Sequence, residues 1–531
     1  MQSLDGVQPE TTEQLDDKSR GLVEQWVTEI CLYEKQAETW HERAKKILRR
    51  YKDDRSPREG QVSRMNIFWS NVQTLLPSIY GQPPKPNVER RFKDEDKVGR
   101  YAADILERSV SYFVKEPTFN NSVKQAVFDY IVAGRGTVWA RYVPHFRDME
   151  VVGNEEIRDE GAEVTNDAEL GDSDEVEPVQ EVYYEEVILD YVNYEDFGHT
   201  IGRTPDEIRA YWRKVYLDKD ELTERFGADK AEKTPLDYSP TNLNDSKISA
   251  DLKKATIYEI WDKTTKKAIW LHKDLELPLD EIDDPLRLRG FFPCPKPMFA
   301  NLANDSCIPT PDYTQYQDQA YEIDNLTSRI SAMQKALKVA GVYDSSAKGI
   351  ERLLSEGGEN KLIPVDQWAA FGEKGGLKGV IEFLPIQEIA NTIQILYQIR
   401  DKVKADLYEI SGIADIMRGV SDPDETATAQ TLKGQYSSIR LKDKQDEVRR
   451  FAKDAVVIMA EIIAEHFSID TIKKVSGIHL LTNAEKQQAQ NLLQRIAQPP
   501  APQPMQNQQP PRPPMPPQQP PQGVPPMGGV R

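Results

Sequence analysis

The sequence predicts a mainly helical α+β protein with several long helices, and three observations carry this prediction. Apolar residues recur at spacings of three and four over most of the chain. A central region changes to a spacing of two, which is typical of strands. Two long amphipathic segments enclose a compact, Gly-rich stretch. The 531 residues are roughly three times the ~150 residues typical of one domain, so several packed regions are expected.

Four helices are predicted in the N-terminal part of the chain. The first places Leu22, Trp26 and Ile30 on one face and ends in the cationic run RAKKILRRYK. Pro77 is expected to end the second helix, and Gly134 to end the fourth. These helices span residues 18–51, 65–77, 94–114 and 121–133.

A small β-rich region is expected after Gly134. Strands are predicted at residues 137–143 and 183–190, followed by the pair ATIYEIWD and KAIWLH around a turn at residues 263–267. Between them, residues 204–227 are expected to form two short helices with N-caps at Thr204 and Asp218.

Two segments need no packed core. Residues 148–186 hold sixteen Asp or Glu against a single basic residue, which favours a solvated loop or insertion. Residues 499–531 contain fourteen prolines, with Gln, Met and Gly among the rest. This tail is expected to be disordered with polyproline character, either as a free tail or as a ligand for an aromatic groove.

The C-terminal half is predicted to contain three long helices. The first two, at residues 312–337 and 385–410, flank a mixed, Gly-rich insert. A loop rich in Gly, Asp and Pro follows, and the third helix spans residues 426–467. Its middle, residues 440–450, is nearly all charged and is expected to form a solvated face or to pair with another subunit.

Composition and motifs argue against most catalytic classes. With 68 basic and 87 acidic residues the net charge is −19, against the broad basic face of a tightly clamping nucleic-acid binder. No GxxxxGK[ST], HExxH, GxSxG or paired CxxC is present. We therefore expect no catalytic residues, no metal site and no cofactor. No apolar run of ~18 residues or secretory pattern occurs, so no membrane association is expected and a reducing cytoplasm is the default compartment.

Several passages together resemble one protein family. These are NIFWSNVQTLLPSIYGQPPKPNVERRFKDEDKVGRYAADILERSVSYFVKE, FNNSVKQAVFDYIVAGRGTVWARYVP, YVNYEDFGH, YWRKVYLDKDELTERFG, IPTPDYTQYQDQAYEIDNLTSRISAMQKALKVAGVYDSS and ETATAQTLKGQYSSIRLKDKQDEVRRFAKD, which cover most of residues 65–467. They resemble the portal proteins, or head-to-tail connectors, of tailed double-stranded DNA bacteriophages.

The resemblance implies a ring of identical subunits, usually twelve, built as wing, stem, clip and crown around a channel. The ring would sit at one capsid vertex of the virion, after assembly in the host cytoplasm, and pass the genome during packaging and ejection. The implied regions are an N-terminal wing at 1–311 with the acidic insert at 148–186, stem helices at 312–338 and 385–411, a clip at 339–384, a tunnel loop at 412–425, a long wing helix at 426–467, a short crown at 468–498 and the tail at 499–531.

The resemblance also implies partners and candidate site residues. Double-stranded DNA would pass without sequence specificity, and the expected partners are the terminase large subunit, major capsid and scaffolding proteins, and tail adaptors. Candidate DNA-channel residues are Arg329, Lys335, Lys402, Lys404 and Arg418; tunnel-loop residues are Met417, Arg418, Asp422 and Asp424; clip residues for the motor or adaptor, or for packing between clips, are Trp368, Phe371 and Lys374.

Two alternatives remain. One is another virion ring, a head-completion protein or a tail adaptor, against which the paired long helices weigh. The other is a metal-dependent nuclease, which a test of divalent-metal-dependent DNA cleavage would reveal.

Overall fold

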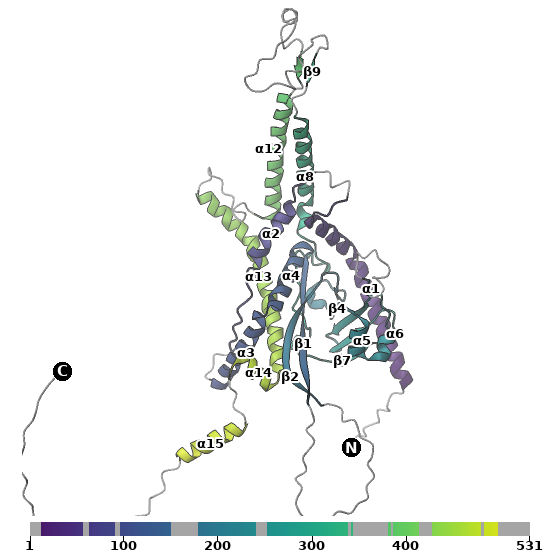
Figure 1. The fold of residues 1–531 in the computed structure, drawn as a ribbon, viewed down its shortest axis with the longest axis vertical. Helices are drawn as coiled ribbons and strands as arrows, with labels where there is room; N and C mark the ends of the chain where they lie inside the picture. Colours follow the sequence, from purple (N-terminus) through teal and green to yellow (C-terminus); the bar gives the residue numbers. More distant parts are fainter. Residues whose placement is uncertain are drawn as a thin grey trace, which may run out of the picture. The chain divides into compact units, whose positions relative to one another are not determined.

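The computed structural model describes residues 12–56, 63–90, 96–149, 179–239, 252–337, 341–343, 381–383, 386–413, 427–478 and 483–497. The fold is α+β and mainly helical, as predicted (Figure 1). The chain divides into two compact units, residues 1–478 and 479–531. The second unit contains α15 (Asn483–Ala497), and all other elements belong to the first.

The four predicted N-terminal helices are confirmed. Asn66 caps α2 by accepting the Trp69 amide, and Asp96 caps α3 by accepting the Val98 amide. The prediction that Pro77 ends the second helix is wrong, because Pro77 lies in the last turn of α2 and the helix continues to Ile79. The helices are α1 (Thr12–Tyr51), α2 (Ile67–Ile79), α3 (Lys97–Lys115) and α4 (Pro117–Val132).

Two antiparallel sheets follow. The first has the order β2-β1-β8, formed by β1 (Arg135–Met149), β2 (Val179–Val192) and β8 (Met298–Phe299). The second has the order β3-β4-β5-β6-β7, formed by β3 (Phe197–His199), β4 (Ala210–Leu217), β5 (Ala255–Asp262), β6 (Lys267–Leu271) and β7 (Asp280–Asp283). The predicted β5–β6 hairpin is confirmed.

The acidic segment is narrower than predicted. Residues 179–182, expected to belong to a solvated loop, lie in β2, where Val143 pairs with Glu186 and Met149 with Val179. The strand predicted at residues 183–190 is confirmed as the following part of β2. The central residues 150–178 lie outside the described part of the chain, as does the Pro-rich tail.

Two short helices are predicted within residues 204–227, and the prediction is wrong for the first of them. Residues Pro205–Glu207 form a single 3-10 turn, and Ala210–Leu217 form strand β4 between β3 and β5. Aromatic and β-branched residues such as Trp212 and Val215 favour this strand once neighbours are available for pairing. The second helix is confirmed as α5 (Lys219–Phe226), where Asp218 and Glu221 form a capping box, and α6 (Ala228–Lys233) follows it.

The three long C-terminal helices are confirmed as α8 (Tyr313–Ala336), α12 (Ile386–Ser411) and α13 (Ala427–His466). Between the first two, β9 (Gly341–Tyr343) and β10 (Ile381–Phe383) form a two-stranded antiparallel sheet. The short helix α14 (Ile469–Ser476) follows α13.

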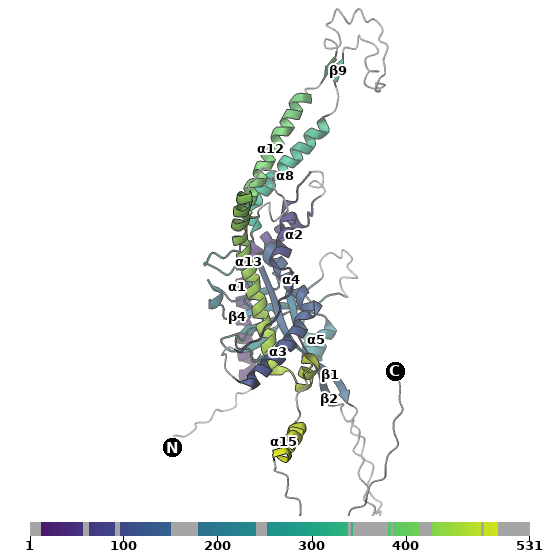
Figure 2. The same cartoon turned by 90° about the vertical axis from the view of Figure 1, so that its left-hand side faces the viewer.

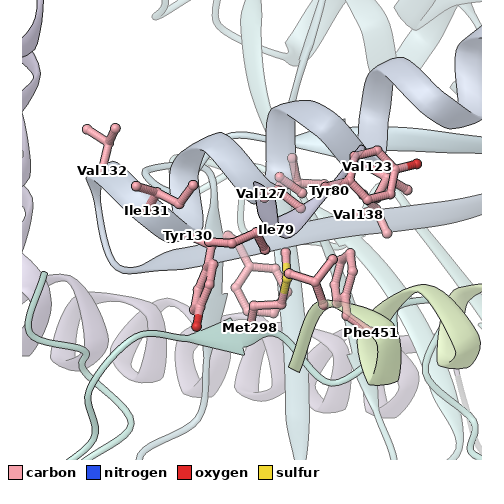
Figure 3. Close-up of a cluster of buried hydrophobic side chains, with 14 of the residues drawn as sticks. Ile79, Tyr80, Val123, Val127, Tyr130, Ile131, Val132, Val138, Met298 and Phe451 are labelled. Carbon is pink, nitrogen blue, oxygen red and sulfur yellow. The ribbon is translucent and has the colours of Figure 1, made fainter. Parts of the chain in front are cut away.

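The main core lies where α2, α4, β1, β8 and α13 meet. Figure 3 shows Tyr130 of α4, Val138 of β1 and Phe451 of α13 converging on Met298 of β8. All four side chains are almost fully buried. A second cluster joins the apolar face of α1 to the five-stranded sheet, through Trp26, Ile30 and Tyr33 among others. The predicted amphipathic face of the first helix is therefore its core face.

A fully buried arginine joins α1 to both sheets. The Arg135 guanidinium, with no exposed surface, donates to the Tyr33 hydroxyl at 2.7 Å and to the carbonyls of Tyr194 and Phe197 at 2.8 and 2.6 Å. Its carbon lies 4.5 Å from the centre of the Trp40 ring. Because a buried cation is costly unless its donors are satisfied, this arrangement fixes α1 against the start of β1.

A second buried polar cluster links the two sheets. The Glu259 carboxylate of β5 accepts from the indoles of Trp139 and Trp261 at 3.1 and 3.0 Å and from the Arg213 guanidinium at 2.7 Å. Arg213 also contacts Asp190 of β2 at 2.9 Å. The two sheets are thus held by a network in which each buried charge has a partner of opposite charge.

The buried carboxyl of Asp129 should make the free energy of unfolding depend on pH. Burial raises the pKa of this carboxyl to about 7, against hydrogen bonds from the Tyr191 hydroxyl and the Tyr194 amide. A raised folded-state pKa means that the contribution of Asp129 is complete below the unfolded-state pKa of about 4 and is lost as the pH rises towards 7. Asp129→Asn, which keeps an acceptor oxygen, should therefore gain stability relative to the parent between pH 5 and pH 8.

Urea unfolding midpoints of the parent and the variant at both pH values measure this difference. The variant is compared with the parent at each pH because two histidines also make stability depend on pH. Burial lowers the pKa of His41 and His199 to about 3, so their contributions to stability are lost as the pH falls below about 6.5. An unchanged difference between variant and parent at pH 5 and pH 8 would contradict the assignment to Asp129.

Candidate nucleic-acid interface

The two long helices α8 and α12 pack side by side and run antiparallel in both views (Figures 1 and 2). The Gln334 side-chain amide of α8 donates to the Tyr397 hydroxyl of α12 at 2.9 Å, which links the two helices at an exposed position. Their buried apolar residues recur at spacings of three, four or seven positions, which place them on one face of each helix. These are Ala320, Ile323, Leu326 and Ile330 on α8, and Ile393, Leu396, Val403 and Leu407 on α12.

Charged contacts anchor α8 to the rest of the unit. Arg50, near the end of α1, contacts Asp324 at 2.6 Å, with both side chains largely buried. The Met65 amide donates to the same carboxylate at 3.1 Å. At the start of the helix, Lys444 of α13 contacts Asp312 at 2.5 Å. The orientation of the helix pair therefore depends on ion pairs formed by residues far apart in the sequence.

The end of α12 is held by an arginine of α13. Arg440 donates to the carbonyls of Ile410 and Glu409 at 2.9 and 3.4 Å, two of the groups that a helix C-terminus leaves without partners. Gly412 turns the chain at φ +70°, and a Cβ there would lie 2.7 Å from the Arg440 side chain. The left-handed conformation therefore favours glycine at this turn, and a larger residue would also displace the Arg440 side chain.

The charged stretch at residues 440–450 is engaged within the chain. Besides Arg440 and Lys444, the Gln445 amide donates to the Ser78 carbonyl at 2.7 Å and Arg450 donates to the Lys296 carbonyl at 3.0 Å. Part of the stretch is nevertheless solvated as predicted, because Arg440, Lys442, Asp443 and Arg449 are exposed. Pairing with another subunit stays a prediction. Charge density in the sequence could not distinguish a solvated side chain from one that spans to a neighbouring element.

The predicted channel cations on the helix pair differ in position. Arg329, Lys335 and Lys402 are exposed, whereas Lys404 is half-buried with its ammonium 5.7 Å from the centre of the Tyr408 ring. At about 100° per residue, Arg329 and Lys335 lie about 120° apart around α8, and Lys402 and Lys404 about 160° apart around α12. The four cations therefore do not lie on one face of the pair.

The helix pair as a whole is slightly acidic. It carries two basic and three acidic residues on α8, and three basic and four acidic residues on α12, a net charge of −2. Such a surface can contact phosphates locally without holding a nucleic acid tightly.

The remaining predicted site residues lie outside the described part of the chain. These are the tunnel-loop residues Met417, Arg418, Asp422 and Asp424, and the clip residues Trp368, Phe371 and Lys374. The structure describes only the residues that flank them. Ile413 and Ala427 lie on either side of the tunnel-loop residues, and strands β9 and β10 lie on either side of the clip residues.

Within the described residues, no group of three or more His, Cys, Asp or Glu side chains could hold a metal ion. None of the described helices combines the length and the apolar character that crossing a membrane requires. No family model matches the chain, and no curated protein sequence is significantly similar to it.

Proposed function

We propose that this chain is the subunit of a bacteriophage portal ring, with about twelve copies surrounding a channel for double-stranded DNA at one capsid vertex. The observation that carries the proposal is the order of elements in the C-terminal half. Two long paired helices enclose an insert that contains a two-stranded sheet, and a third helix of 40 residues follows a short connection. This order agrees with the family that the sequence resembles.

In this proposal α8 and α12 are the stem, residues 339–384 the clip and residues 412–425 the tunnel loop. The N-terminal helices and both sheets, with α13, form the wing, and residues 468–498 form a short crown. The chain has no catalytic role. A separate terminase motor docks at the clip during packaging and tail adaptors replace it later, with Trp368, Phe371 and Lys374 as candidate contacts. Capsid and scaffolding proteins are further partners.

The charge of the stem supports a conduit rather than a clamp. Every phosphate neutralised by a cation adds affinity that must be lost again when the DNA moves. A stem with a net charge of −2 and separated cations keeps the affinity of each subunit for DNA low, while ring symmetry repeats each cation around the channel. Electron microscopy of the purified chain tests the proposal directly. Closed rings with a central opening are expected, and a population of open filaments or dimers would contradict it.

Two stem cations provide a test with an internal control. In the assembled ring, Arg329→Gln with Lys402→Gln should weaken duplex DNA binding by about two- to tenfold at low salt. Removing one exposed carboxylate from each of the same two helices, by Asp318→Asn with Asp401→Asn, should strengthen it by a similar factor. Fluorescence anisotropy with a labelled duplex measures both changes. Equal affinities for the two variants would exclude the stem as a DNA-facing surface.

A further inference from the structure

The end of α1 carries a dense run of cations in an otherwise acidic chain. Residues 43–64 contain nine basic and three acidic side chains, a net charge of +6 against −19 for the whole protein. We define the cationic end of α1 as Lys45, Lys46, Arg49 and Lys52, the four cations of this stretch whose side chains the structure places in solvent.

These four residues form a continuous stripe. Lys45, Arg49 and Lys52 follow one another at spacings of four and three, with Lys46 beside them, while Ala44 and Ile47 are buried on the opposite side of the helix. The stripe is about 10 Å long at 1.5 Å per residue. Arg50, the neighbour that points inward, is committed to Asp324. The helix thus separates one structural cation from four exposed ones.

The exposed cations are weakly engaged. Lys45 lies 3.0 Å from Glu195 and Arg49 lies 3.5 Å from Asp54, but the side chains of Lys45 and Arg49 remain 59% and 60% exposed. Pairs of this kind contribute little and exchange readily with another anion. Lys46 and Lys52 form no ion pair with any residue that the structure describes.

An exposed tryptophan lies at the same end of α1. The Asn66 amide donates to the carbonyls of Arg50 and Tyr51, so α2 begins where α1 ends, and Trp69 stands in the first turn of α2 with half of its surface exposed. One turn later, the Gln73 amide donates to the Tyr51 hydroxyl at 2.9 Å. Exposed cations and exposed aromatic rings are both features that nucleic-acid-binding surfaces use.

We propose that the cationic end of α1 binds the phosphate backbone of DNA as a contact surface separate from the paired helices. The choice of DNA rests on the proposed function, whereas the anion-binding character rests on the stripe itself. Through Arg50–Asp324 and the Ser63–Ser331 hydrogen bond of 3.0 Å, this surface is fixed beside α8, with Lys335 one turn beyond Ser331. DNA held at α1 would therefore be positioned relative to the helix pair.

The test uses the full chain and a labelled duplex of about 30 base pairs, with affinity measured by anisotropy over a range of salt concentrations. The variant Lys45→Gln/Lys46→Gln/Arg49→Gln/Lys52→Gln should bind at least about tenfold more weakly, and its salt dependence should fall by about three to four in the slope of log K against log salt. A matched control, Lys219→Gln/Lys233→Gln/Lys253→Gln/Lys263→Gln, removes four exposed cations elsewhere and should change affinity by less than about threefold.

Three outcomes overturn the inference. Equal losses in variant and control would assign binding to overall charge, and unchanged binding in the variant would remove α1 from the interface. Competition by polyglutamate as effective as competition by unlabelled duplex would indicate an acidic protein partner instead. The native mass of the variant separates this test from the proposed function. If the α1 variant forms a ring of parental mass but has lost DNA binding, both proposals are supported. If only the Arg329→Gln/Lys402→Gln variant loses DNA binding, the proposal for the α1 surface is overturned and the proposed function stands.

Discussion

Arg135→Met should destabilise the protein by about 3 kcal/mol or more. Methionine has a similar length but donates no hydrogen bond. It would leave the Tyr194 carbonyl and the Tyr33 hydroxyl without the hydrogen bond that Arg135 donates, whereas the Phe197 carbonyl would keep the Tyr33 hydroxyl as a donor at 3.2 Å. Each such group costs about 1–3 kcal/mol when it loses its only partner in a dry interior. The lost contact with the Trp40 ring adds to the effect.

The matched control is another arginine on the same strand. Arg141 pairs with Asp190, but its side chain is 45% exposed, so Arg141→Met should cost less than about 1 kcal/mol. Urea unfolding of both variants gives the comparison. If the two substitutions have equal effects, the buried Arg135 cluster does not hold α1 to the sheets.

Gly136→Ala is expected to have an effect of similar size, for a purely steric reason. A Cβ at this position would lie 1.9 Å from the Ala126 carbonyl oxygen and 2.9 Å from the Met298 side chain. The first of these atoms belongs to the backbone of α4, so β1 and α4 must move apart at the centre of the core. Overpacking of this kind costs about 3 kcal/mol.

The same substitution at Gly21 provides the control. Gly21 lies on the exposed side of α1, and no atom stands within 4 Å of the position that a Cβ would take. Gly21→Ala should therefore leave the unfolding midpoint unchanged or raise it. A midpoint for Gly136→Ala equal to that of the parent protein would mean that β1 does not pack on α4 as closely as the structure has it.

Much of the fold could be predicted because its long helices have a strong period. The apolar positions of α1, α8 and α12 recur over six or more turns, and the β5–β6 hairpin alternates cleanly around its turn. Strand β4 could not be predicted in the same way. Its eight residues are too few to separate helix from strand, and its pairing with β3 and β5 decides the outcome.

The candidate interface was only partly predictable. The sequence locates the helix pair and its basic residues, but the face on which each one lies depends on packing, which leaves Lys404 beside Tyr408 and Arg329 in solvent. The contacts of Arg50 with Asp324 and of Arg440 with Ile410 join residues 274 and 30 positions apart. A charged residue in such a contact has no local pattern that marks it.

The native mass of the purified particle without DNA tests the central claim most directly. A ring of twelve subunits of 60.6 kDa each has a mass of about 727 kDa, and ring closure makes this, or the mass of a neighbouring ring, the single dominant species. A dominant monomer or dimer at every salt concentration would contradict the account, as would a continuous series of masses.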